Sequence, residues 1–369
     1  MRKIGQSDRV DKYKKQRIAT IVISLILIVL ATMWLLQFQK AEKEKLEKQK
    51  LKGLSIFFPE SEISALLYDG NHIWVGGRDG VYLMEPQSGE IVKEIAKDIH
   101  MTYTAGICQL DDGSVWIGHE NGLTVFSDEH RIDFASPQIP SGRVNTVVKD
   151  GDQGVWAGTQ TGAVHFIKKD DNYVIETTLT SKNGLIEDAV NTITLGQDNS
   201  LWFGAYLANE VGGISILKEG KWQYFSVQQG LPHRYVTAII PIDEEYMLVG
   251  LGHLDRGGMA LFRSDDMQKI MEKVYSSDDG LPGEKIRQLY LDSKGHLWVT
   301  SESDGLLICP SYKGLHELPL EGKYLTTKDG LSDNEIKTII EAEGYYWLGG
   351  RYGLTRIESE TVEELFVNY

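Results

Sequence analysis

The chain has 369 residues, a length that allows two average domains or one large all-β domain. It contains 38 glycines but only 9 prolines, and its eight tryptophans and 17 tyrosines are spread along the sequence, a composition that favours many short strands joined by tight turns. Residues 1–53 carry a net charge of +8, whereas residues 54–369 hold 25 basic and 48 acidic residues, a net charge of −23. This acidic body argues against nucleic acid as a partner, because neutralising phosphates requires basic residues.

The first predicted element is a membrane-spanning helix over residues 18–38. This stretch, IATIVISLILIVLATMWLLQF, has 21 residues and no charge, and as a helix it is about as long as the 30 Å hydrocarbon core of a bilayer. Trp34 near its end suits an interfacial anchor. A cleaved signal peptide is the alternative, but the apolar run is longer than a typical signal segment and no A-x-A cleavage site follows it. We therefore expect a signal anchor.

Basic residues flank both ends of this helix. Seven precede it and six follow within residues 39–53, so the positive-inside rule gives a slight preference for a cytoplasmic basic tail over residues 1–17. Residues 39–53 are predicted to form a charged stalk, either helical, with Glu–Lys pairs three and four residues apart, or flexible. This topology predicts a single-pass protein of the cell membrane in which residues 54–369 are extracytoplasmic.

One element recurs seven times after the stalk. Each copy has a polar turn followed by a short apolar strand with a large side chain at a fixed place: Trp74, Trp116, Trp156, Trp202, Met247, Trp298 and Trp347. The steps between these positions are 40 to 51 residues, and a period in the forties with a Trp-bearing strand predicts a seven-bladed β-propeller over residues 54–369. Tryptophans of this kind can stack on a ligand, but one per repeat at one strand position is the pattern that packing between sheets requires.

Each copy divides into four strands. In the sixth copy these are predicted, from the axis outward, at residues 285–292, 296–301, 304–310 and 323–333. Two segments compete for the outer strand of the seventh blade: the N-terminal LSIFF and the C-terminal VEELFVNY. Either choice closes the ring and removes an exposed sheet edge.

The sixth and seventh copies, GLPGEKIRQLYLDSKGHLWVTSESDGLLI and GLSDNEIKTIIEAEGYYWLGGRYGLTRI, resemble the two-component regulator propeller repeat. That family has a GLP turn, an inner strand, an Asp-Gly turn, a Leu-Trp-Ile-Gly-Thr strand and a Gly-Leu strand; the fifth copy departs from it at YMLVGL, and the first lacks the GLP turn. The resemblance implies the extracytoplasmic sensing part of a hybrid histidine kinase. Because we find no phosphorylation segment, ATP-binding motif or receiver domain in this sequence, it further implies signalling through a separate partner.

Three loops carry the candidate ligand-binding residues. The loops GAYLANEVGG and GLGHLDRGGM join the second and third strands of the fourth and fifth copies, and GLPHRYV leads into the fifth. Because strands in a blade alternate in direction, all three loops are expected on one face. The candidate residues are Tyr206, Glu210, His233, Arg234, His253, Asp255 and Arg256. Their chemistry suits a polar ligand such as a sugar, a peptide or an anionic group, although solvated surface insertions would have the same composition.

We therefore expect a ligand- or protein-binding sensor module that works with a separate signalling or transport protein, and not an enzyme. Two alternatives stay open. An assembly scaffold in a membrane complex is one. The other is an enzyme, because the repeats also look like those of streptogramin lyases, and His233 with Glu210, or His253 with Asp255, could form an acid–base pair. No zinc spacing, nucleophile elbow or phosphate loop is present, and Cys108 and Cys309 form no cluster, so no catalytic residue, metal or cofactor is predicted.

Overall fold

The computed structural model describes residues 28–29, 31–40, 50–95, 101–127, 130–151, 154–170, 172–207, 211–265 and 268–367. The chain divides into two compact units, Met1–Lys50 and Leu51–Tyr369. In the first unit residues 31–40 are helical, and the rings of Trp34 and Phe38 stack with centroids 5.7 Å apart. Among the described residues, no helix has the length and apolar character needed to cross a bilayer. Most of the predicted span 18–38 and the tail 1–17 lie outside the described residues, so the membrane helix stays a prediction.

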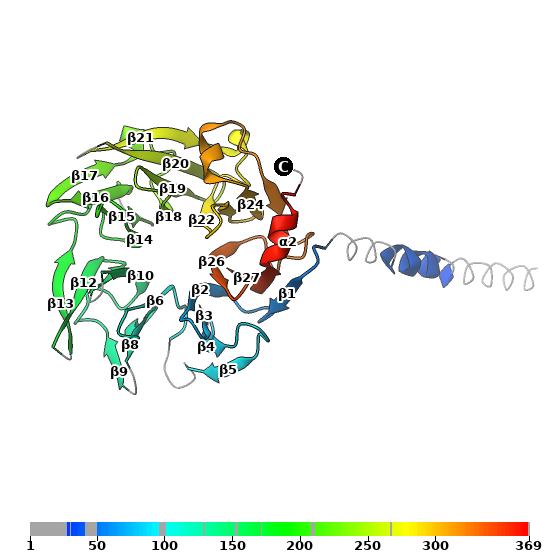
Figure 1. Ribbon diagram of the computed structural model, residues 1–369, viewed down its shortest axis with the longest axis horizontal. Helices are drawn as coiled ribbons and strands as arrows, with labels where there is room; N and C mark the ends of the chain where they lie inside the picture. Colours follow the sequence, from blue (N-terminus) through cyan, green and yellow to red (C-terminus); the bar gives the residue numbers. More distant parts are fainter. Residues whose placement is uncertain are drawn as a thin grey trace, which may run out of the picture. The chain divides into compact units, whose positions relative to one another are not determined.

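The second unit consists of seven four-stranded antiparallel sheets arranged in a ring, which confirms the seven-bladed propeller (Figure 1). We number the blades in chain order. Blade 1 contains β2 (Ile63–Tyr68), β3 (Ile73–Gly77), β4 (Gly80–Met84) and β5 (Ile91–Glu94). Blade 2 contains β6 (Gly106–Gln109), β7 (Val115–His119), β8 (Gly122–Ser127) and β9 (His130–Phe134). Blade 3 contains β10 (Val144–Asp150), β11 (Gly154–Thr159), β12 (Gly162–Lys169) and β13 (Asn172–Leu179).

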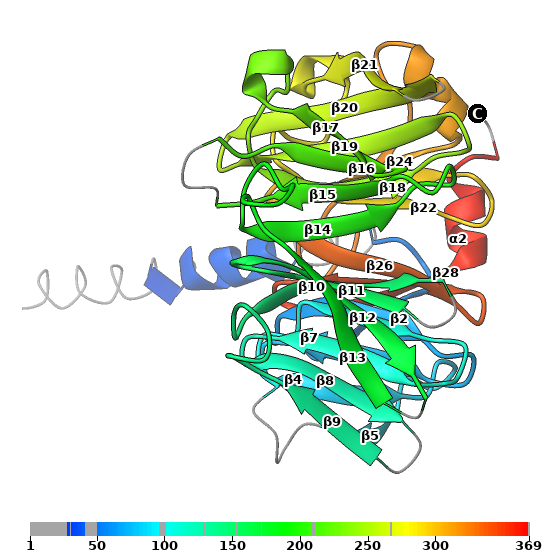
Figure 2. The same cartoon turned by 90° about the vertical axis from the view of Figure 1, so that its left-hand side faces the viewer.

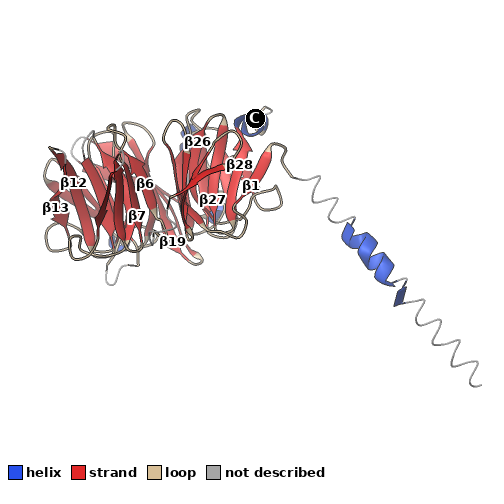
Figure 3. Ribbon diagram, turned by 90° about the horizontal axis from the view of Figure 1, so that it is seen from below, coloured by secondary structure: helices blue, strands red, loops and turns tan. Residues whose placement is uncertain are grey.

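The remaining blades follow the same plan and are seen from the side in Figures 2 and 3. Blade 4 contains β14 (Val190–Leu195), β15 (Leu201–Ala205), β16 (Ile214–Lys218) and β17 (Lys221–Phe225). Blade 5 contains β18 (Val236–Pro241), β19 (Tyr246–His253), β20 (Arg256–Asp265) and β21 (Gln268–Tyr275). Blade 6 contains β22 (Ile286–Leu291), β23 (Leu297–Ser301), β24 (Leu306–Cys309) and β25 (Lys323–Leu325). Blade 7 contains β26 (Ile336–Ala342), β27 (Tyr345–Gly350), β28 (Gly353–Glu358) and β1 (Leu54–Phe57). The short helices are η1 (Val227–Gln229), η2 (Ser277–Asp279), η3 (Tyr312–His316) and α2 (Ser359–Glu364).

The N-terminal strand closes the ring. β1 pairs with β28 in antiparallel register, from Leu54 opposite Ile357 to Phe57 opposite Leu354, so the first and last strands of the propeller share one sheet (Figure 1). The C-terminal segment, the other candidate for this place, forms no strand in its described part: it begins within helix α2 and continues as a turn through residues 365–367. Its Val362 is fully buried against blades 6 and 7. The closing strand therefore belongs to the end of the chain that follows the predicted stalk.

Packing between blades accounts for the repeated tryptophans. Most of them contact an aromatic ring of the next blade, with centroid separations of 4.7 to 6.2 Å: Trp74 with Phe126, Trp116 with Phe166, Trp156 with Phe203, Trp202 with Phe262, and Trp298 with Tyr346. Trp347 packs on the residues of blade 1. In blade 5 the prediction of Met247 is wrong by one residue: Leu248 pairs with Ile240 as Trp202 pairs with Thr194, and it fills the space toward blade 6. Met247 is on the opposite face of its strand and packs toward blade 4. None of these side chains is more than 9% exposed, so the interpretation as core and not as ligand platform is confirmed.

A carboxylate in the preceding turn anchors many of the indoles. Trp74 Nε1 donates to Asp69 at 2.8 Å, and the same bond recurs between Trp156 and Asp150 (3.0 Å) and between Trp298 and Asp292 (3.1 Å). In blades 2 and 4 a serine two residues before the Trp accepts the bond instead. The Asp-Gly turns of the repeat thus have a structural role: they satisfy the one polar atom of a buried indole.

The turn preceding several inner strands has a common capping geometry. A Ser or Thr begins it, and the side chain three residues later accepts hydrogen bonds from its backbone N–H and hydroxyl: Thr180–Asn183, Ser226–Gln229, Ser276–Asp279 and Thr326–Asp329. The next residue is a glycine with positive φ, as at Gly230 (98°), and a buried leucine follows, as at Leu231. This is the physical basis of the GL motif: glycine adopts the left-handed conformation without strain, and the leucine enters the space between blades.

Replacing Trp116 by alanine is expected to lower the free energy of unfolding by about 3–5 kcal/mol, because it removes a fully buried ring that contacts the next blade. Equilibrium unfolding in denaturant, followed by far-UV circular dichroism, measures the change. Trp222→Ala is the matched control, since Trp222 is only half-buried on the rim strand β17, and its loss should be clearly smaller. Equal losses would contradict the packing role of the repeated tryptophan.

His165 predicts a pH dependence of stability. Its ring stacks on Trp156 (4.5 Å between centroids), with Nδ1 2.8 Å from Glu176 and Nε2 3.1 Å from Asp150. Burial lowers the pKa of His165, but the two carboxylates outweigh burial and raise it. Protonated His165 thus stabilises the fold fully below the unfolded pKa of about 6.5, and this contribution is lost as the pH rises through the folded pKa.

We expect His165→Gln to be less stable than the wild type at pH 6, with a difference that shrinks toward pH 9. Denaturant unfolding at a series of pH values measures it. A difference that stays constant over this range would show that His165 contributes through packing alone.

Candidate functional site

The candidate site is the opening of the central channel on one face of the ring. Two adjoining cavities, of about 320 and 390 Å³, lie there. The first extends along the inner strands and the second opens among the loops. We call their shared wall the channel mouth: Glu62, Arg143, Asn145, Asn191, Arg287 and Lys337. The second cavity is lined both by segments that enter inner strands, such as Glu335, and by loops between second and third strands, such as Tyr206 and Arg351. The prediction that these two kinds of loop share a face is therefore confirmed.

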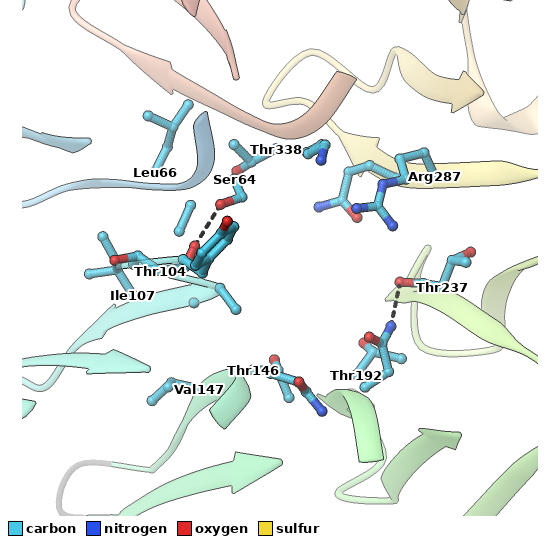
Figure 4. A pocket seen from close by; sticks show the side chains of 18 of the residues that line it. Ser64, Leu66, Thr104, Ile107, Thr146, Val147, Thr192, Thr237, Arg287 and Thr338 are labelled. Carbon is cyan, nitrogen blue, oxygen red and sulfur yellow. Dashed lines mark hydrogen bonds between the residues drawn. The ribbon is translucent and has the colours of Figure 1, made fainter. Parts of the chain in front are cut away.

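A repeated β-bulge directs side chains into the channel. In six of the seven inner strands the pairing register shifts by one residue near the strand's start, between positions such as Val144 and Thr146. The extra residue of each bulge lines the first cavity: Ser64, Asn145, Asn191, Thr237, Arg287 and Lys337. Bulges of this kind re-aim a side chain that regular alternation would place elsewhere. Figure 4 shows how side chains of successive inner strands surround the channel.

Four of these bulge residues bond to the next blade. Ser64 Oγ donates to the carbonyl oxygen of Thr104 at 2.6 Å, and Thr237 Oγ1 donates to that of Ile286 at 2.6 Å. Asn145 Nδ2 and Asn191 Nδ2 donate in the same way to Val190 (2.9 Å) and Val236 (3.2 Å). Because each bond joins neighbouring inner strands, the polar wall of the channel is itself part of the ring's framework.

Blades 6 and 7 place cations at the equivalent positions. Lys337 Nζ lies 2.9 Å from a carboxylate oxygen of Glu62 and 3.4 Å from one of Glu335, and Arg287 Nε lies 3.2 Å from Glu335. Lys285, whose side chain is only 4% exposed, pairs with Glu302 at 2.7 Å and donates to Tyr206 Oη at 3.2 Å. These cations are therefore balanced by carboxylates within the wall, as buried charges must be.

The mouth is nevertheless more basic than the rest of the propeller. Five of the eight charged residues that line the second cavity are basic, although residues 54–369 as a whole contain nearly twice as many acidic as basic residues. Sequence reasoning did not select Arg143, Arg287, Lys337 or Arg351. Aligning the inner strands would have indicated Arg287 and Lys337, because they interrupt a position held by Ser, Asn and Thr in other blades.

Four of the residues selected from the sequence converge beside the mouth. Tyr206 and His253 lie against the ring of Tyr235, with centroids 5.1 and 5.4 Å away. His233 contacts the same ring at 5.0 Å, and the Arg234 guanidinium lies 5.1 Å from its centroid. We call this group, Tyr206, His233, Arg234, Tyr235 and His253, the blade-five corner. Tyr235, which the sequence reasoning passed over, is its centre.

The other three selected residues are placed differently. Arg256 pairs with His253 across the β19–β20 hairpin and is exposed, and Asp255 lies at the exposed tip of that hairpin. Glu210 lies outside the described residues. No His–carboxylate pair involving His233 or His253 occurs in the described part of the chain, so the acid–base pair weighed for a lyase is not formed by Asp255.

The blade-five corner is electrostatically positive. Burial lowers the pKa of His233, and the positive charges of four neighbours lower it further: His253, Arg234, Arg256 and Lys285. Its Nδ1 accepts a hydrogen bond from the backbone N–H of Tyr235 at 3.0 Å, which fixes the ring. A neutral imidazole among cations is suited to accept or donate hydrogen bonds to a ligand without adding charge.

We expect the pKa of His233 to lie below 6.5 and to rise in Arg256→Gln, because that substitution removes a nearby positive charge. NMR titration of the imidazole carbon-bound protons measures both values. Arg131→Gln, on the rim strand of blade 2, is the control and should leave the pKa of His233 unchanged. An Arg256→Gln variant with an unchanged His233 pKa would contradict the electrostatic coupling.

Residues 280–303, which include the GL turn, inner strand and Trp strand of blade 6, match the protein-family model described as Two component regulator propeller. The match confirms the repeat family that the sequence resembles. None of the curated proteins matches this chain.

Three solved structures illustrate the likeness of the fold. One is the extracellular domain of BT3049 from B. thetaiotaomicron, described as a hybrid two component system (TM-score 0.65, 16% identity); the alignment covers 83% of this chain and 41% of that domain. Another is a catalytically inactive virginiamycin B lyase of Staphylococcus aureus with Quinupristin (TM-score 0.60, 14% identity); the alignment covers 83% of this chain and 98% of the lyase. The third is YCF48 from Cyanidioschyzon merolae (TM-score 0.59, 12% identity); the alignment covers 84% of this chain and 99% of YCF48. At these identities they show the fold alone, and this chain spans about two fifths of the length of the BT3049 domain.

Proposed function

We propose that this chain, whose sixth repeat matches the two-component regulator propeller family, is a sensor propeller that binds a polar ligand and signals through a separate protein. The observation that carries the proposal is the concave opening of the ring, where charged, amide and aromatic side chains of several blades converge on two adjoining cavities. Ligand sites are typically concave openings of a few hundred Å³ with a small number of placed polar groups. A rigid scaffold that presents variable loops is the usual setting for such a site.

The proposal includes a membrane anchor at residues 18–38 and an extracytoplasmic propeller. The supporting observations are the uncharged run of 21 residues and the slight excess of basic residues before it. The described extracellular location of the similar BT3049 domain is consistent with this topology. The signal then has to pass to another signalling or transport protein of the same membrane.

The ligand is a sugar, a peptide or an anionic small molecule. Tyr206 and Tyr235 offer aromatic faces beside the mouth, and Arg234 and Arg256 offer positively charged N–H donors. Sugars and peptides use such aromatic and polar surfaces together. Binding without catalysis agrees with the surroundings of His233, where the charged neighbours that shift its pKa are all cations.

A peptide-binding role in the assembly of a membrane complex is the second candidate. YCF48, which is similar in fold, has been solved bound to D1 peptide (TM-score 0.59). The two roles differ in the partner, since a sensor requires a signalling protein and an assembly factor requires a client chain.

Screening neutral oligosaccharides, peptides and organic acids against the full-length protein in detergent should give at least one ligand that raises the melting temperature. The double variant His253→Ala, Arg256→Ala is expected to lose this binding by calorimetry without a change in its own melting temperature, because both side chains lie at the edge of the fold. Arg131→Ala serves as the control and should bind as the wild type does. Undiminished binding by the double variant would exclude the blade-five corner as the site.

A further inference from the structure

The charges of the channel mouth fall into two groups. Three cations and three carboxylates of the second cavity are paired with one another at 2.7 to 3.4 Å: Lys285 with Glu302, Arg287 with Glu335, and Lys337 with Glu62 and Glu335. Glu335 and Lys337 are each only 10% exposed at their side chains, which makes this network a fixed part of the wall. The pairs neutralise each other, so they leave no net charge for a ligand.

Arg143 and Arg351 form the second group. Both line the cavity of about 390 Å³, both are exposed, and within the described residues neither has a carboxylate at ion-pair distance. Arg351 lies over the ring of Tyr352 with 5.4 Å between its guanidinium carbon and the ring centroid. Two guanidinium groups without anionic partners, beside carboxylates that are all engaged, give the opening a net charge of about +2.

The two arginines lie on opposite sides of the axis. Arg143 directly precedes β10 in blade 3, and Arg351 directly follows β27 in blade 7. In a ring of seven, blade 7 is three places from blade 3 in one direction and four in the other. Figure 1 shows β10 and β27 across the channel from each other. The free positive charges are therefore separated across the opening, with the neutral amides Asn145, Gln160 and Asn191 also in the wall.

The two arginines are positive groups on a propeller that is acidic as a whole. The propeller carries a net charge of −23 over residues 54–369, so its long-range field repels anions, and attraction has to come from groups at the site itself. Guanidinium groups bind carboxylate, sulfate and phosphate oxygens through paired N–H donors. Because the two groups stand apart, a single compact anion satisfies one of them and leaves the other without a partner.

We infer that the channel mouth binds an elongated ligand with an anionic group at each end, one held by Arg143 and the other by Arg351. The anionic groups are carboxylate, sulfate or phosphate, which share the oxygen chemistry that a guanidinium recognises. The inference rests on the proposed function and specifies the ligand of that site: the paired network of Lys337, Glu62 and Glu335 is the neutral wall along which the ligand lies.

The test uses the full-length protein in detergent and isothermal titration calorimetry at fixed ionic strength. The probes are unbranched dicarboxylates of increasing length (succinate, adipate, suberate), the monocarboxylates of equal length, and inorganic phosphate. We expect at least one dicarboxylate to bind about tenfold or more tightly than the monocarboxylate of equal length, because it makes two charge-assisted contacts instead of one. Phosphate, as a compact anion, should bind no better than a monocarboxylate.

The variants assign the two contacts. Arg143→Gln and Arg351→Gln should each reduce the affinity for the dicarboxylate to that for the monocarboxylate, and the double variant should lose no further preference. Arg131→Gln is the matched control, because Arg131 pairs with Asp133 on rim strand β9 and leaves the mouth unchanged. Melting temperatures of all variants confirm that the ring is intact.

The inference is overturned if dicarboxylates and monocarboxylates bind equally, if phosphate binds as tightly as the best dicarboxylate, or if either arginine variant keeps the dicarboxylate preference. Its failure is distinct from failure of the proposed function. A neutral sugar or peptide that binds in a manner dependent on His253 and Arg256 would keep the sensor site and remove only the two-anion ligand. Absence of binding by every probe class would remove both.

Discussion

The ring depends on one packing constraint: a large side chain at one position of each second strand has to fill the space against the following blade. Trp116 and Trp202 show the arrangement, since each is fully buried and contacts a phenylalanine of the next sheet. A buried indole has one polar atom, and in blades 1 to 4 and 6 a carboxylate or serine shortly before the Trp satisfies it, as Asp150 does for Trp156. In these blades the Trp thus joins its own strand to the preceding turn by a hydrogen bond and to the next blade by packing, which holds neighbouring sheets at a constant spacing.

Closure of the ring covers the last exposed sheet edge. A seventh sheet with only three strands would leave β28 as an exposed edge, and β1 covers it by antiparallel pairing. The Arg356 guanidinium lies over Tyr345 (4.4 Å to the ring centroid) and donates to the carbonyl oxygen of Gln87 in blade 1 (2.7 Å), which ties blade 7 to its neighbour. The two ends of the propeller are thus joined by backbone pairing and by side-chain contacts.

The site uses the framework without disturbing it. Polar bulge residues such as Asn145 and Thr237 donate hydrogen bonds to the next inner strand. Arg287 of blade 6 and Lys337 of blade 7 form ion pairs with Glu335 and Glu62. What remains for a ligand is the set of groups on the loops, chiefly Arg143, Arg351 and the blade-five corner. The charges of the wall are paired with one another, whereas within the described residues Arg143 and Arg351 have no carboxylate at ion-pair distance, which explains how an acidic protein presents a basic opening.

The sequence by itself determined the period, the face on which the loops lie and, in six of the seven blades, the packing position, because each of these repeats along the chain and is set by local patterns. In blade 5, where no Trp marks the position, the prediction of Met247 missed Leu248 by one residue. It also predicted that Tyr206, His233, Arg234 and His253 lie near one another, since the alternating strand direction places their loops side by side. It did not determine the closing strand, because two segments of similar apolar character compete for one edge. Nor did it show the β-bulges, which shift the register by one residue and turn Arg287 and Lys337 into the channel. Arg143 and Arg351 share an opening only because the ring closes: they belong to blades 3 and 7, and no local pattern relates residues that distant in sequence until the tertiary structure places them around one axis.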